Sequence, residues 1–394
     1  MSKQEYSMPR RLLSIAVGLI LSAPLAATTF EMTDPNAAVI GHNMVVYSRS
    51  EDTLLDIGRQ FDLGYRDITD ANPGVDAWLP GEGTRVVVPT RFILPDAPRE
   101  GIVINIAEMR LYYYPKTAKD SLQQVVTHPI GIGREGWATP LGKTRITNKV
   151  KNPTWTPPES IRKEHLENGD PLPKVVPAGP DNPLGAYKMN LSMPGYLLHG
   201  TNKPFGVGLR VSHGCIRLYP EDIEHLFHLT PSNTGVEILY QPHKAGLRNG
   251  QLYLEAHRQH KDVDVREGNN MTPMVKAILT AQDSLVSDEQ WPLAEDIVRD
   301  QKGVVIPVGQ KQLDIVENLW FLHAGVNKQA VSKMRQAIIT LQLDDLFWPV
   351  RSGPKEETLI GPFNTREEAD IMGKEVAAVA GTPVWTVQVS SDAL

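Results

Sequence analysis

The stretch Ser212-His213-Gly214-Cys215-Ile216-Arg217-Leu218 contains the only cysteine of this 394-residue chain. A second polar cluster, Leu198-His199-Gly200-Thr201-Asn202, lies shortly before it. A thiol is a strong nucleophile only as the thiolate, and a nearby imidazole can take its proton. A lone cysteine is often a small core residue instead. The polar, glycine-flanked setting nevertheless favours a reactive Cys215.

The composition of the whole chain restricts the classes of protein to consider. Its length predicts two to four domains. Hydrophobic residues at 41% and charged residues at 22% are typical of a globular protein. The formal net charge of -6, without a long basic stripe, argues against a nucleic-acid-binding protein.

The first 27 residues have the pattern of a secretory signal peptide. Lys3, Arg10 and Arg11 precede the apolar run Leu12–Leu21, and small residues follow around Ala26. We expect cleavage near residue 27, with an uncleaved anchor as the alternative. An exported protein that uses cysteine for structure carries pairs of them. A single cysteine in an exported chain is therefore either incidental or chemically used.

Residues 42–90 are predicted to form a strand, two helices and a closing strand. The strands are 44–47 and 84–89, and the helices are 52–61, capped by Asp52 or Thr53, and a short one ending before Pro73-Gly74. This segment resembles a LysM domain, and the resemblance implies binding of N-acetylglucosamine polymers. A purely structural module is the alternative. The residues that carry the resemblance are Asp52-Thr53-Leu54, Ile57, Phe61, Ile68, Ala71-Asn72-Pro73 and Val86-Val87-Val88-Pro89.

Residues 100–241 are β-rich and contain both polar clusters. A hairpin is predicted from 102–106 and 109–114, with a further strand at 123–127. Short strands separated by turn residues predict a β-sandwich. The proline-rich insertion 151–183, with a helix at 159–166, is the kind of long loop that commonly carries function.

The remainder of the chain divides into two further regions. Residues 242–312 are predicted to be a helical appendage packed on the β-rich unit, with a strand-like stretch at 253–255 and helices at 273–279 and 293–298. Residues 316–391 show a β-α-β-β-α-β pattern and resemble a SPOR domain, through Ile360-Gly361-Pro362-Phe363 and Thr365-Arg366-Glu367-Glu368-Ala369. That resemblance implies binding to peptidoglycan strands that lack stem peptides. An α/β cap without a separate function is the alternative.

The two polar clusters of the β-rich unit resemble the L,D-transpeptidases of bacterial walls, which have a YkuD-type catalytic domain. With the LysM-like segment they are similar to the periplasmic ErfK, YbiS, YcfS and YnhG branch. The stretches that support this resemblance are Gly131-Ile132-Gly133, 137–142, 152–158 and 179–185. The resemblance implies a mainly β catalytic core and a cysteine acyltransferase that needs no metal or organic cofactor.

The resemblance also implies roles for individual residues. Cys215 attacks the meso-diaminopimelate–D-Ala bond of a tetrapeptide stem, D-Ala leaves, and an amine resolves the thioester. His199 is the expected general base, oriented by the backbone carbonyl of Gly200. Backbone amides of His213, Gly214 and Cys215 are the expected oxyanion hole.

Other residues are candidates for contact with substrate. Arg217 is predicted to hold a stem-peptide carboxylate, because a planar guanidinium suits that group. Pairing of Arg217 with Glu221 or Asp222 is the alternative. His213 has a structural alternative, as a loop-fixing residue. Further substrate-binding candidates are Ser212, Trp155, Tyr196 and Asn202.

Metal chemistry is a weaker interpretation of the same residues. A zinc hydrolase would use His199, His213 and Cys215 as ligands, but no acidic base residue accompanies them. His225 and His228 are spaced like a metal pair without a third ligand. The isolated histidines His42, His128 and His165 are predicted to lie at the surface.

The sequence therefore predicts a periplasmic peptidoglycan L,D-transpeptidase of the Gram-negative envelope. The expected partners are peptidoglycan stem peptides, glycan strands and an outer-membrane lipoprotein whose lysine accepts the acyl group. A second diaminopimelate amine, giving 3-3 cross-links, and water, giving an L,D-carboxypeptidase, are alternative acceptors. A non-catalytic wall-binding protein is the alternative from another class.

Overall fold

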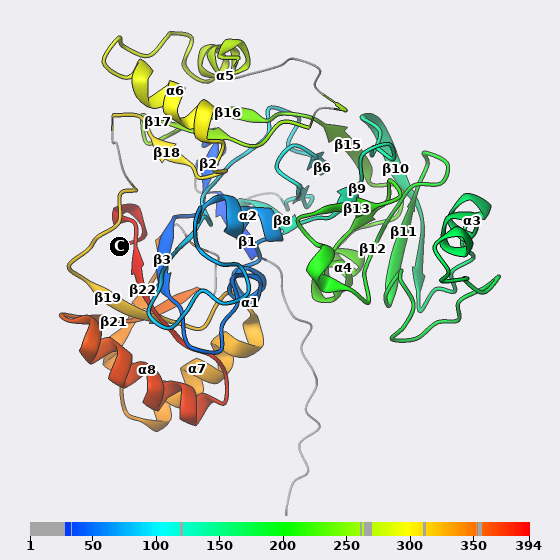
Figure 1. The fold of residues 1–394 in the computed structure, drawn as a ribbon. Coiled ribbons are helices and arrows are strands. Elements are labelled where there is room, and N and C mark those ends of the chain that lie inside the picture. Colours follow the sequence, from blue (N-terminus) through cyan, green and yellow to red (C-terminus); the bar gives the residue numbers. More distant parts are fainter. Residues whose placement is uncertain are drawn as a thin grey trace, which may run out of the picture.

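The computed structural model describes residues 28–32, 34–118, 121–260, 262–263, 270–309, 313–351, 353 and 357–394 (Figure 1). The predicted signal peptide lies outside the described residues. Among the helices that are described, none is both long and apolar enough to cross a membrane.

The β-rich region forms one nine-stranded sheet of mixed direction. In spatial order its strands are β1 (Thr28–Met32), β8 (Gln123–Pro129), β7 (Arg110–Tyr114), β6 (Gly101–Asn105), β15 (Gly235–Leu239), β10 (Gly142–Lys151), β11 (Tyr187–Leu191), β12 (Leu197–His199) and β14 (Ile216–Arg217). A separate pair consists of β9 (Ile132–Gly133) and β13 (Arg210–Ser212). The predicted hairpin is confirmed as β6 and β7.

The predicted sandwich of two sheets is replaced by a single sheet that bends at β10. The first part of β10 pairs with β15, and its second part, after a register shift between Ile146 and Asn148, pairs with β11. An irregularity of this kind bends a strand and increases its twist. The two halves of the curled sheet consequently enclose one core, in which Ile104 and Leu111 meet Met189 and Leu198.

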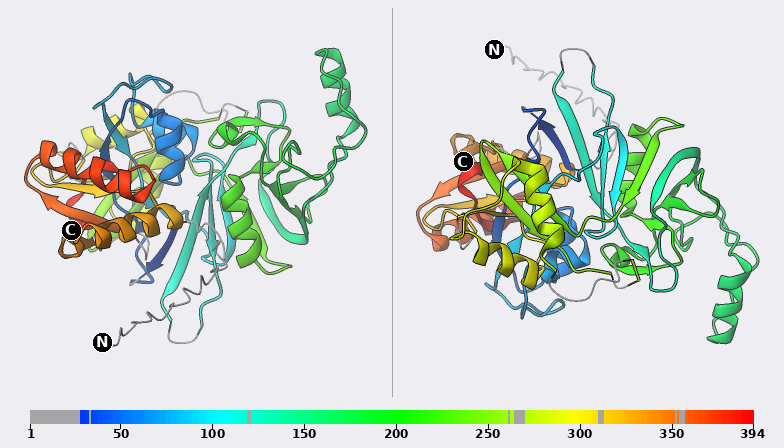
Figure 2. Two further views of the ribbon diagram at one scale, coloured as in Figure 1. Left: turned by 90° about the horizontal axis from the view of Figure 1, so that it is seen from below. Right: turned by 90° about the horizontal axis from the view of Figure 1, so that it is seen from above.

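Two helices accompany this sheet. Helix α3 (Glu159–Glu167) matches the predicted helix of the insertion and projects at the outer end of the sheet (Figure 2). Helix α4 (Pro220–Leu229) follows β14 directly. It begins with Pro220, which suits the first turn of a helix, and buries Ile223 and Leu226 against the sheet core.

The predicted strand–helix–helix–strand order is found in residues 42–90. The elements are β3 (Met44–Tyr47), α1 (Leu54–Gln60), α2 (Tyr65–Asp70) and β4 (Arg85–Val88). The Thr53 hydroxyl accepts the Asp56 amide hydrogen at 3.0 Å, and the Asp56 carboxylate reaches back to the Thr53 amide, so the predicted cap is a capping box.

The C-terminal region also has the predicted element order. Its elements are β19 (Trp320–His323), α7 (Lys328–Thr340), β20 (Phe347–Pro349), β21 (Thr358–Phe363), α8 (Arg366–Ala380) and β22 (Trp385–Val389), with short 3-10 turns η2 (Asp344–Leu346) and η3 (Ser391–Ala393). Asn327 and Thr365 cap the two helices with their side chains.

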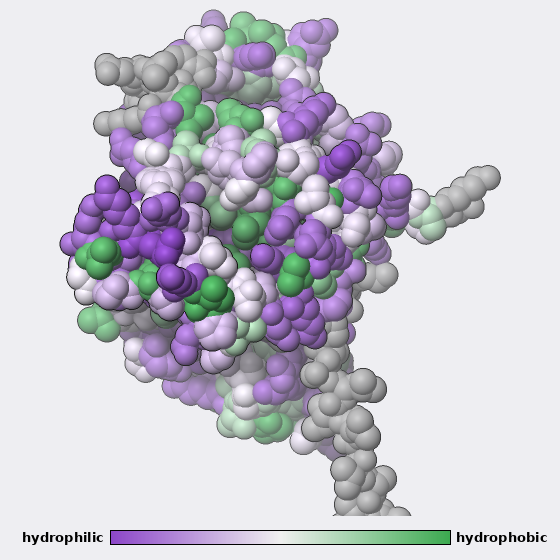
Figure 3. Space-filling model, turned by 90° about the vertical axis from the view of Figure 1, so that its right-hand side faces the viewer, coloured by the Kyte–Doolittle hydropathy of each residue, from purple (hydrophilic) through white to green (hydrophobic). Residues whose placement is uncertain are grey.

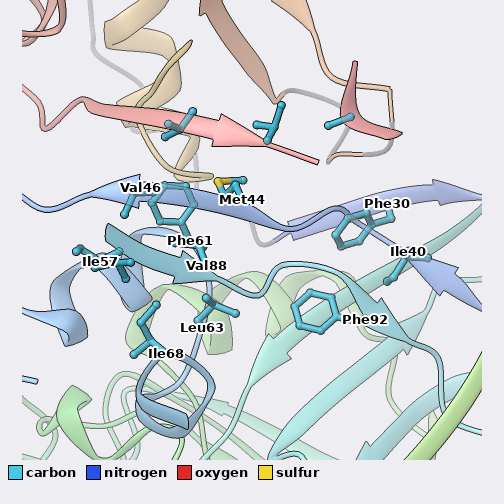
Figure 4. Close-up of a cluster of buried hydrophobic side chains, with 14 of the residues drawn as sticks. Phe30, Ile40, Met44, Val46, Ile57, Phe61, Leu63, Ile68, Val88 and Phe92 are labelled. Atoms are coloured by element: carbon cyan, nitrogen blue, oxygen red, sulfur yellow. The ribbon is translucent and has the colours of Figure 1, made fainter. Parts of the chain in front are cut away.

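These N- and C-terminal regions form one body, although the sequence predicts two separate modules. A six-stranded sheet runs β20-β21-β19-β22-β3-β4, and Val387 of β22 lies opposite Val46 of β3. One apolar core contains Phe61 from the N-terminal region together with Phe321 and Trp385 from the C-terminal region. Figure 4 shows Val46 and Phe61 at the centre of this core. The domain boundaries drawn from the sequence therefore divide a continuous sheet.

The segment predicted as a helical appendage contains a sheet as well as helices. Helices α5 (Thr272–Gln282) and α6 (Trp291–Asp300) accompany the strands β16 (His243–Arg248), β17 (Gln251–Ala256) and β18 (Ile306–Pro307). Tyr253 and Val305 pack on Val39 and Ile93, which belong to β2 (Val39–Ile40) and β5 (Phe92–Ile93). The segment thus packs on the flanks of the N-terminal region, and its Lys244 binds Glu108, which lies between β6 and β7 of the nine-stranded sheet.

The face on the catalytic side is mainly hydrophilic. In Figure 3 the hydrophobic residues of this face are scattered and do not gather into one large patch. Surface hydrophobic residues that occur singly are normal in folded proteins.

Candidate active site

The two polar clusters meet because β12 and β14 are neighbouring parallel strands. Leu198 lies opposite Ile216, and His199 lies opposite Arg217. Leu198 and Ile216 are buried in the sheet core. Successive side chains on a strand point to opposite faces. His199 and Arg217 therefore lie on the other face, together with Cys215, which immediately precedes β14.

His199 is a buried, neutral imidazole held by its neighbour. Its Nδ1 lies 2.5 Å from the carbonyl oxygen of Gly200. A carbonyl only accepts hydrogen bonds, so Nδ1 carries the hydrogen and Nε2 keeps its lone pair. Burial, and then the charge of Arg217, lower the pKa of His199 to about 3, although the carbonyls of Gly200 and Pro183 partly oppose this. At neutral pH the ring can accept a proton at Nε2.

Cys215 is a protonated thiol in the resting structure. Its Sγ lies 3.7 Å from the carbonyl oxygen of Gly195. Burial raises the pKa of the thiol, while the backbone amide of Leu197 and the charge of Arg217 lower it in part. No hydrogen bond between Cys215 and His199 is present in the described part of the chain. Proton transfer to His199 therefore requires the thiol to turn away from Gly195.

Arg217 does not pair with Glu221 or Asp222, the two carboxylates considered as its partners in the alternative prediction. Glu221 accepts two hydrogen bonds from Arg59, at 2.7 and 2.8 Å. Asp222 lies 3.2 Å from His128. Among the described residues, no carboxylate lies within 4.0 Å of the Arg217 guanidinium, and its buried Nε has no hydrogen-bond partner. The guanidinium is thus available to an anion from outside the chain.

One glycine pairs with the backbone of Arg217, and another makes room for its side chain. The backbone of Gly131 exchanges hydrogen bonds of 2.8 and 2.9 Å with that of Arg217. At Gly206, in the 3-10 turn η1 (Pro204–Gly206), an added Cβ would lie 2.6 Å from Arg217 Nη1. A side chain at position 206 would therefore displace the guanidinium.

The loop before Cys215 is braced by hydroxyl groups. Ser212 Oγ donates to the carbonyl of Cys215 at 2.6 Å and accepts the amide hydrogen of Gly214 at 3.2 Å. Thr139 Oγ1 donates to the carbonyl of Gly214 at 2.9 Å. The structure thus places the Ser212 hydroxyl inside the loop, whereas the sequence suggested contact with substrate. The Gly214 amide, an expected oxyanion-hole donor, is already bonded here.

Gly214 is required at its position by backbone shape and by packing. Its φ is +100°, where residues with a side chain are strained. A Cβ at Gly214 would also lie 2.9 Å from Cε1 of Tyr196. Tyr196, one of the substrate-binding candidates, therefore lies against the Cys215 loop.

His213 is fixed by groups that the sequence did not indicate. Its Nε2 lies 2.9 Å from a carboxylate oxygen of Glu164 in α3, and Arg134 Nη2 donates to the same carboxylate at 2.7 Å. The hydrogen bond from Arg134 has the largest effect on Glu164 and lowers the pKa of its carboxyl group, and the hydrogen bond with His213 lowers it further. The ring of Trp137 meets His213 edge-on at 5.0 Å. Helix α3 of the insertion thus holds the loop that precedes Cys215. His213 and Glu164 are 49 positions apart, so their contact could not be predicted from the sequence.

The other substrate-binding candidates lie in connecting segments. The backbone of Trp155 pairs with Val176 through hydrogen bonds of 2.9 and 2.8 Å, closing the base of the insertion. Asn202 Nδ2 donates to the carbonyl of Asp181 at 2.9 Å. Within the described residues, no hydrogen bond or ring contact joins Trp155 or Asn202 to Cys215.

The histidines outside the site only partly follow expectation. His42 and His128 were predicted at the surface but are 1% and 0% exposed, because each lies beside a buried carboxylate, Glu357 and Asp222 respectively. His165 is partly exposed. Among the described residues, two groups of side chains are arranged to hold a metal ion, and neither includes the zinc ligands considered for a hydrolase.

Comparison with known proteins shows which protein family this chain resembles. Residues 99–238 match the YkuD family model, described as an L,D-transpeptidase catalytic domain. The Escherichia coli K12 protein named probable L,D-transpeptidase YbiS is 41% identical over 288 residues, which cover 71% of this chain and 92% of that protein. Probable L,D-transpeptidase YcfS of the same strain is 42% identical, over 66% of this chain and 81% of its own length.

A third relative and a solved structure extend the comparison. Probable L,D-transpeptidase ErfK/SrfK of E. coli K12 is 38% identical, over 75% of this chain and 96% of its own length. The NMR structure of the catalytic domain from E. faecium L,D-transpeptidase aligns over its full length with 37% of this chain, at 22% identity and a TM-score of 0.26.

Proposed function

This chain belongs to the L,D-transpeptidase family, and we propose that it is an exported peptidoglycan L,D-transpeptidase with Cys215 as its nucleophile. The main observation in support of this proposal is that Cys215, His199 and Arg217 lie on one face of the β12–β14 pair. This face combines a thiol, a neutral base and a cation without a carboxylate partner.

In the proposed acylation, Cys215 Sγ attacks the carbonyl carbon between meso-diaminopimelate and D-Ala in a tetrapeptide stem. His199 Nε2 takes the thiol proton as the S–C bond forms. The tetrahedral intermediate then breaks its C–N bond, and His199 returns the proton to the departing amine of D-Ala. The product is a thioester on Cys215. The buried hydrogen bond from Nδ1 to Gly200 supports this assignment, since it keeps Nε2 free to accept.

The second half of the reaction reverses these roles. An acceptor amine attacks the thioester carbon, His199 takes a proton from that amine, and the thiol of Cys215 leaves with the proton. The Cys215 and Leu197 amides are our candidates for the oxyanion hole. The Leu197 amide already stabilises the thiolate form of Cys215, which supports its direction toward the reacting atoms.

Arg217 is proposed to bind a carboxylate of the stem peptide. Its charge lowers the pKa values of both His199 and Cys215. A bound carboxylate screens that charge, so the pKa of His199 rises when substrate is present. The base consequently becomes stronger only in the complex, and the free enzyme keeps a neutral, less reactive thiol.

The terminal regions are proposed to hold the enzyme on peptidoglycan. Their LysM-like and SPOR-like element orders support glycan binding, and multivalent attachment would raise the local concentration of stem peptides. We place the protein in the periplasm on the basis of its predicted signal peptide. A pull-down of Cys215→Ala protein with purified sacculi tests the attachment. Protein that stays in the supernatant would contradict it.

The acceptor is proposed to be a lipoprotein lysine, with a diaminopimelate amine or water as the alternatives. Intact-mass spectrometry with disaccharide-tetrapeptide, with and without a lysine-ended lipoprotein peptide, separates the three. Transfer of the acyl group to the peptide supports lipoprotein attachment. Cross-linked dimers made without the peptide support 3-3 bonds, and tripeptide alone supports a carboxypeptidase. A Cys215→Ala variant that keeps turnover would refute the proposal.

A further inference from the structure

A second group of chemically capable side chains lies buried between the N-terminal region and the catalytic sheet. Asp62 is in the loop between α1 and α2, His128 is in β8, and Asp222 is in the first turn of α4. These side chains are 6%, 0% and 4% exposed. One ligand atom from each lies within 4.8 Å of the other two, and His128 Nδ1 is 3.2 Å from Asp222 Oδ1.

The polar atoms of this cluster lack ordinary partners. Both carboxylate oxygens of Asp62, Oδ2 of Asp222 and both ring nitrogens of His128 are buried without a hydrogen bond of normal geometry. Buried polar groups are nearly always hydrogen-bonded, and each exception needs an explanation. The Thr28 hydroxyl acts on the Asp62 carboxylate, and the carboxylates of Asp62 and Asp222 act on each other, but none of these groups supplies a positive charge.

The arginine side chains nearest to this cluster form ion pairs with other carboxylates. Arg110 donates to the Asp67 carboxylate at 2.9 Å and to the backbone oxygen of Asp62 at 3.0 Å. Arg59 is held by Glu221. Two adjacent carboxylates in a buried site need a nearby positive charge, or must become neutral by taking up protons.

A comparable cluster elsewhere in the described chain has its own cation. Glu108, Glu255 and His257 also lie within ligand distance of one another. There, however, Lys244 Nζ is 2.6 Å from Glu108 and 3.1 Å from Glu255. The lysine already supplies the positive charge for that cluster. The cluster of Asp62, His128 and Asp222 has no equivalent among the described residues.

We propose that Asp62, His128 and Asp222 bind a divalent transition-metal ion of the zinc class as a structural site. One imidazole and two carboxylates are a suitable donor set for zinc. Tetrahedral ligands at about 2.0–2.2 Å from zinc are roughly 3.3–3.6 Å apart, slightly more than the 3.2 Å between His128 and Asp222. His225 lies nearby, with its ring 6.0 Å from that of His128, but it is outside the group of three whose ligand atoms converge.

The metal would tie three segments together. It would join the α1–α2 loop to β8 and to α4, the helix that directly follows the Cys215 loop and β14. Stability of the contact between the N-terminal body and the catalytic segment would then depend on the ion. The site takes no part in the transfer reaction, so its test does not depend on activity.

The test uses mature, tag-free protein carrying Cys215→Ser, which removes the active-site thiol as a competing ligand. The protein is stripped with a chelator, incubated with Zn²⁺, desalted and analysed for metal by mass spectrometry. We expect one zinc per chain, and a melting temperature about 3 °C or more above that of the stripped protein. Protein that retains no zinc would overturn the proposal.

Variants locate the ion. Asp62→Asn with Asp222→Asn should abolish zinc retention while the stripped variant melts no lower than the stripped parent, because unpaired buried charges have been removed. The exposed pair Asp344→Asn with Asp345→Asn removes the same charge and should keep one zinc. Equal zinc retention by the buried-pair variant and the parent would refute the site.

A spectroscopic readout covers the case in which the buried-pair variant does not fold. Co²⁺ is added to stripped protein that keeps Cys215. Nitrogen and oxygen ligands give visible d–d bands without a thiolate-to-cobalt charge-transfer band. A charge-transfer band instead would place the ion at the active-site cysteine and overturn the proposal.

Discussion

Trp385 Nε1 donates a hydrogen bond of 2.9 Å to Asp52 Oδ2, across 333 positions of sequence. Trp385 lies in the last strand of the chain, and Asp52 lies just before helix α1. Arg49 covers the indole ring and also binds Asp52. One buried contact thus joins the two regions that resemble separate glycan-binding modules.

Replacing Trp385 by Phe should destabilise both regions together. The change removes one donor to Asp52 Oδ2, which keeps the backbone amide of Arg49 at 2.8 Å, and it removes ring volume, at a cost of about 1–3 kcal/mol. Urea unfolding followed by circular dichroism measures the loss. Trp78→Phe, at an exposed tryptophan, is the matched control and should change stability by less than about 0.5 kcal/mol. Equal stability of the two variants would contradict the shared-body interpretation.

Arg217→Gln should reduce kcat/KM for tetrapeptide by roughly 100-fold, because a desolvated charge-assisted contact with substrate is lost. The same change removes a charge that lowers the pKa of Cys215. Alkylation of Cys215 by iodoacetamide at pH 8 should therefore slow as well. Arg145→Gln, at an exposed residue of β10, should leave both rates unchanged. Unaltered alkylation in Arg217→Gln would show that the guanidinium does not act on the thiol.

Glu164→Gln should loosen the hold of α3 on His213. The amide keeps the shape of the carboxylate but loses its ion pair with Arg134. We expect kcat/KM to fall on the order of 10-fold, with no change in melting temperature. Glu167→Gln, on an exposed part of the same helix, is the control. Added salt screens the exposed pair, so activity of the parent should fall with salt more steeply than activity of Glu164→Gln.

His199→Gln should abolish turnover and reduce the acid sensitivity of the fold. In the folded protein the pKa of His199 is about 3, below its ordinary 6.5. Between these values only the unfolded chain takes up the proton, so the stability due to neutral His199 is complete above pH 6.5 and is lost as pH falls toward 3. Without His199 the free energy of unfolding should fall less steeply, by up to about 1.4 kcal/mol per pH unit.

Urea titrations at pH 7, 6 and 5 measure that slope. Cys215→Ala is the control, because it should also lose turnover but retains His199 and hence the parent slope. Identical slopes for His199→Gln and the parent would mean that the imidazole is not held neutral by burial.

Local structure was predictable where the signal is local. Turn residues and β-branched residues mark the hairpin of β6 and β7, and Thr53 marks the start of α1. The pairing of β3 with β22 was not predictable, because each strand reads as the end of its own module. The sequence of a single strand does not identify a pairing partner that lies hundreds of residues away.

The candidate site divides in the same way. Cys215, His199 and Arg217 were visible because unusual residue types fall close together in the sequence. Glu164 was not, since an ordinary glutamate on a helix carries no signal until the fold brings it to the Cys215 loop. Thr139 belongs to a stretch that supports the family resemblance, but its hydrogen bond to Gly214 was not predicted. The buried state of His128 was missed because its carboxylate neighbour comes from another element.

The sheet shared by the two ends of the chain has a consequence for biogenesis. Tyr47 of β3 and Gln388 of β22 are hydrogen-bonded partners 341 positions apart, so one edge of β3 stays unpaired until β22 has been synthesised. Contacts of such high sequence separation form late and slowly. A chain that has not yet made β22 therefore exposes β3 as an aggregation-prone edge, and the N-terminal region can complete its sheet only after nearly all of residues 47–388 have been made.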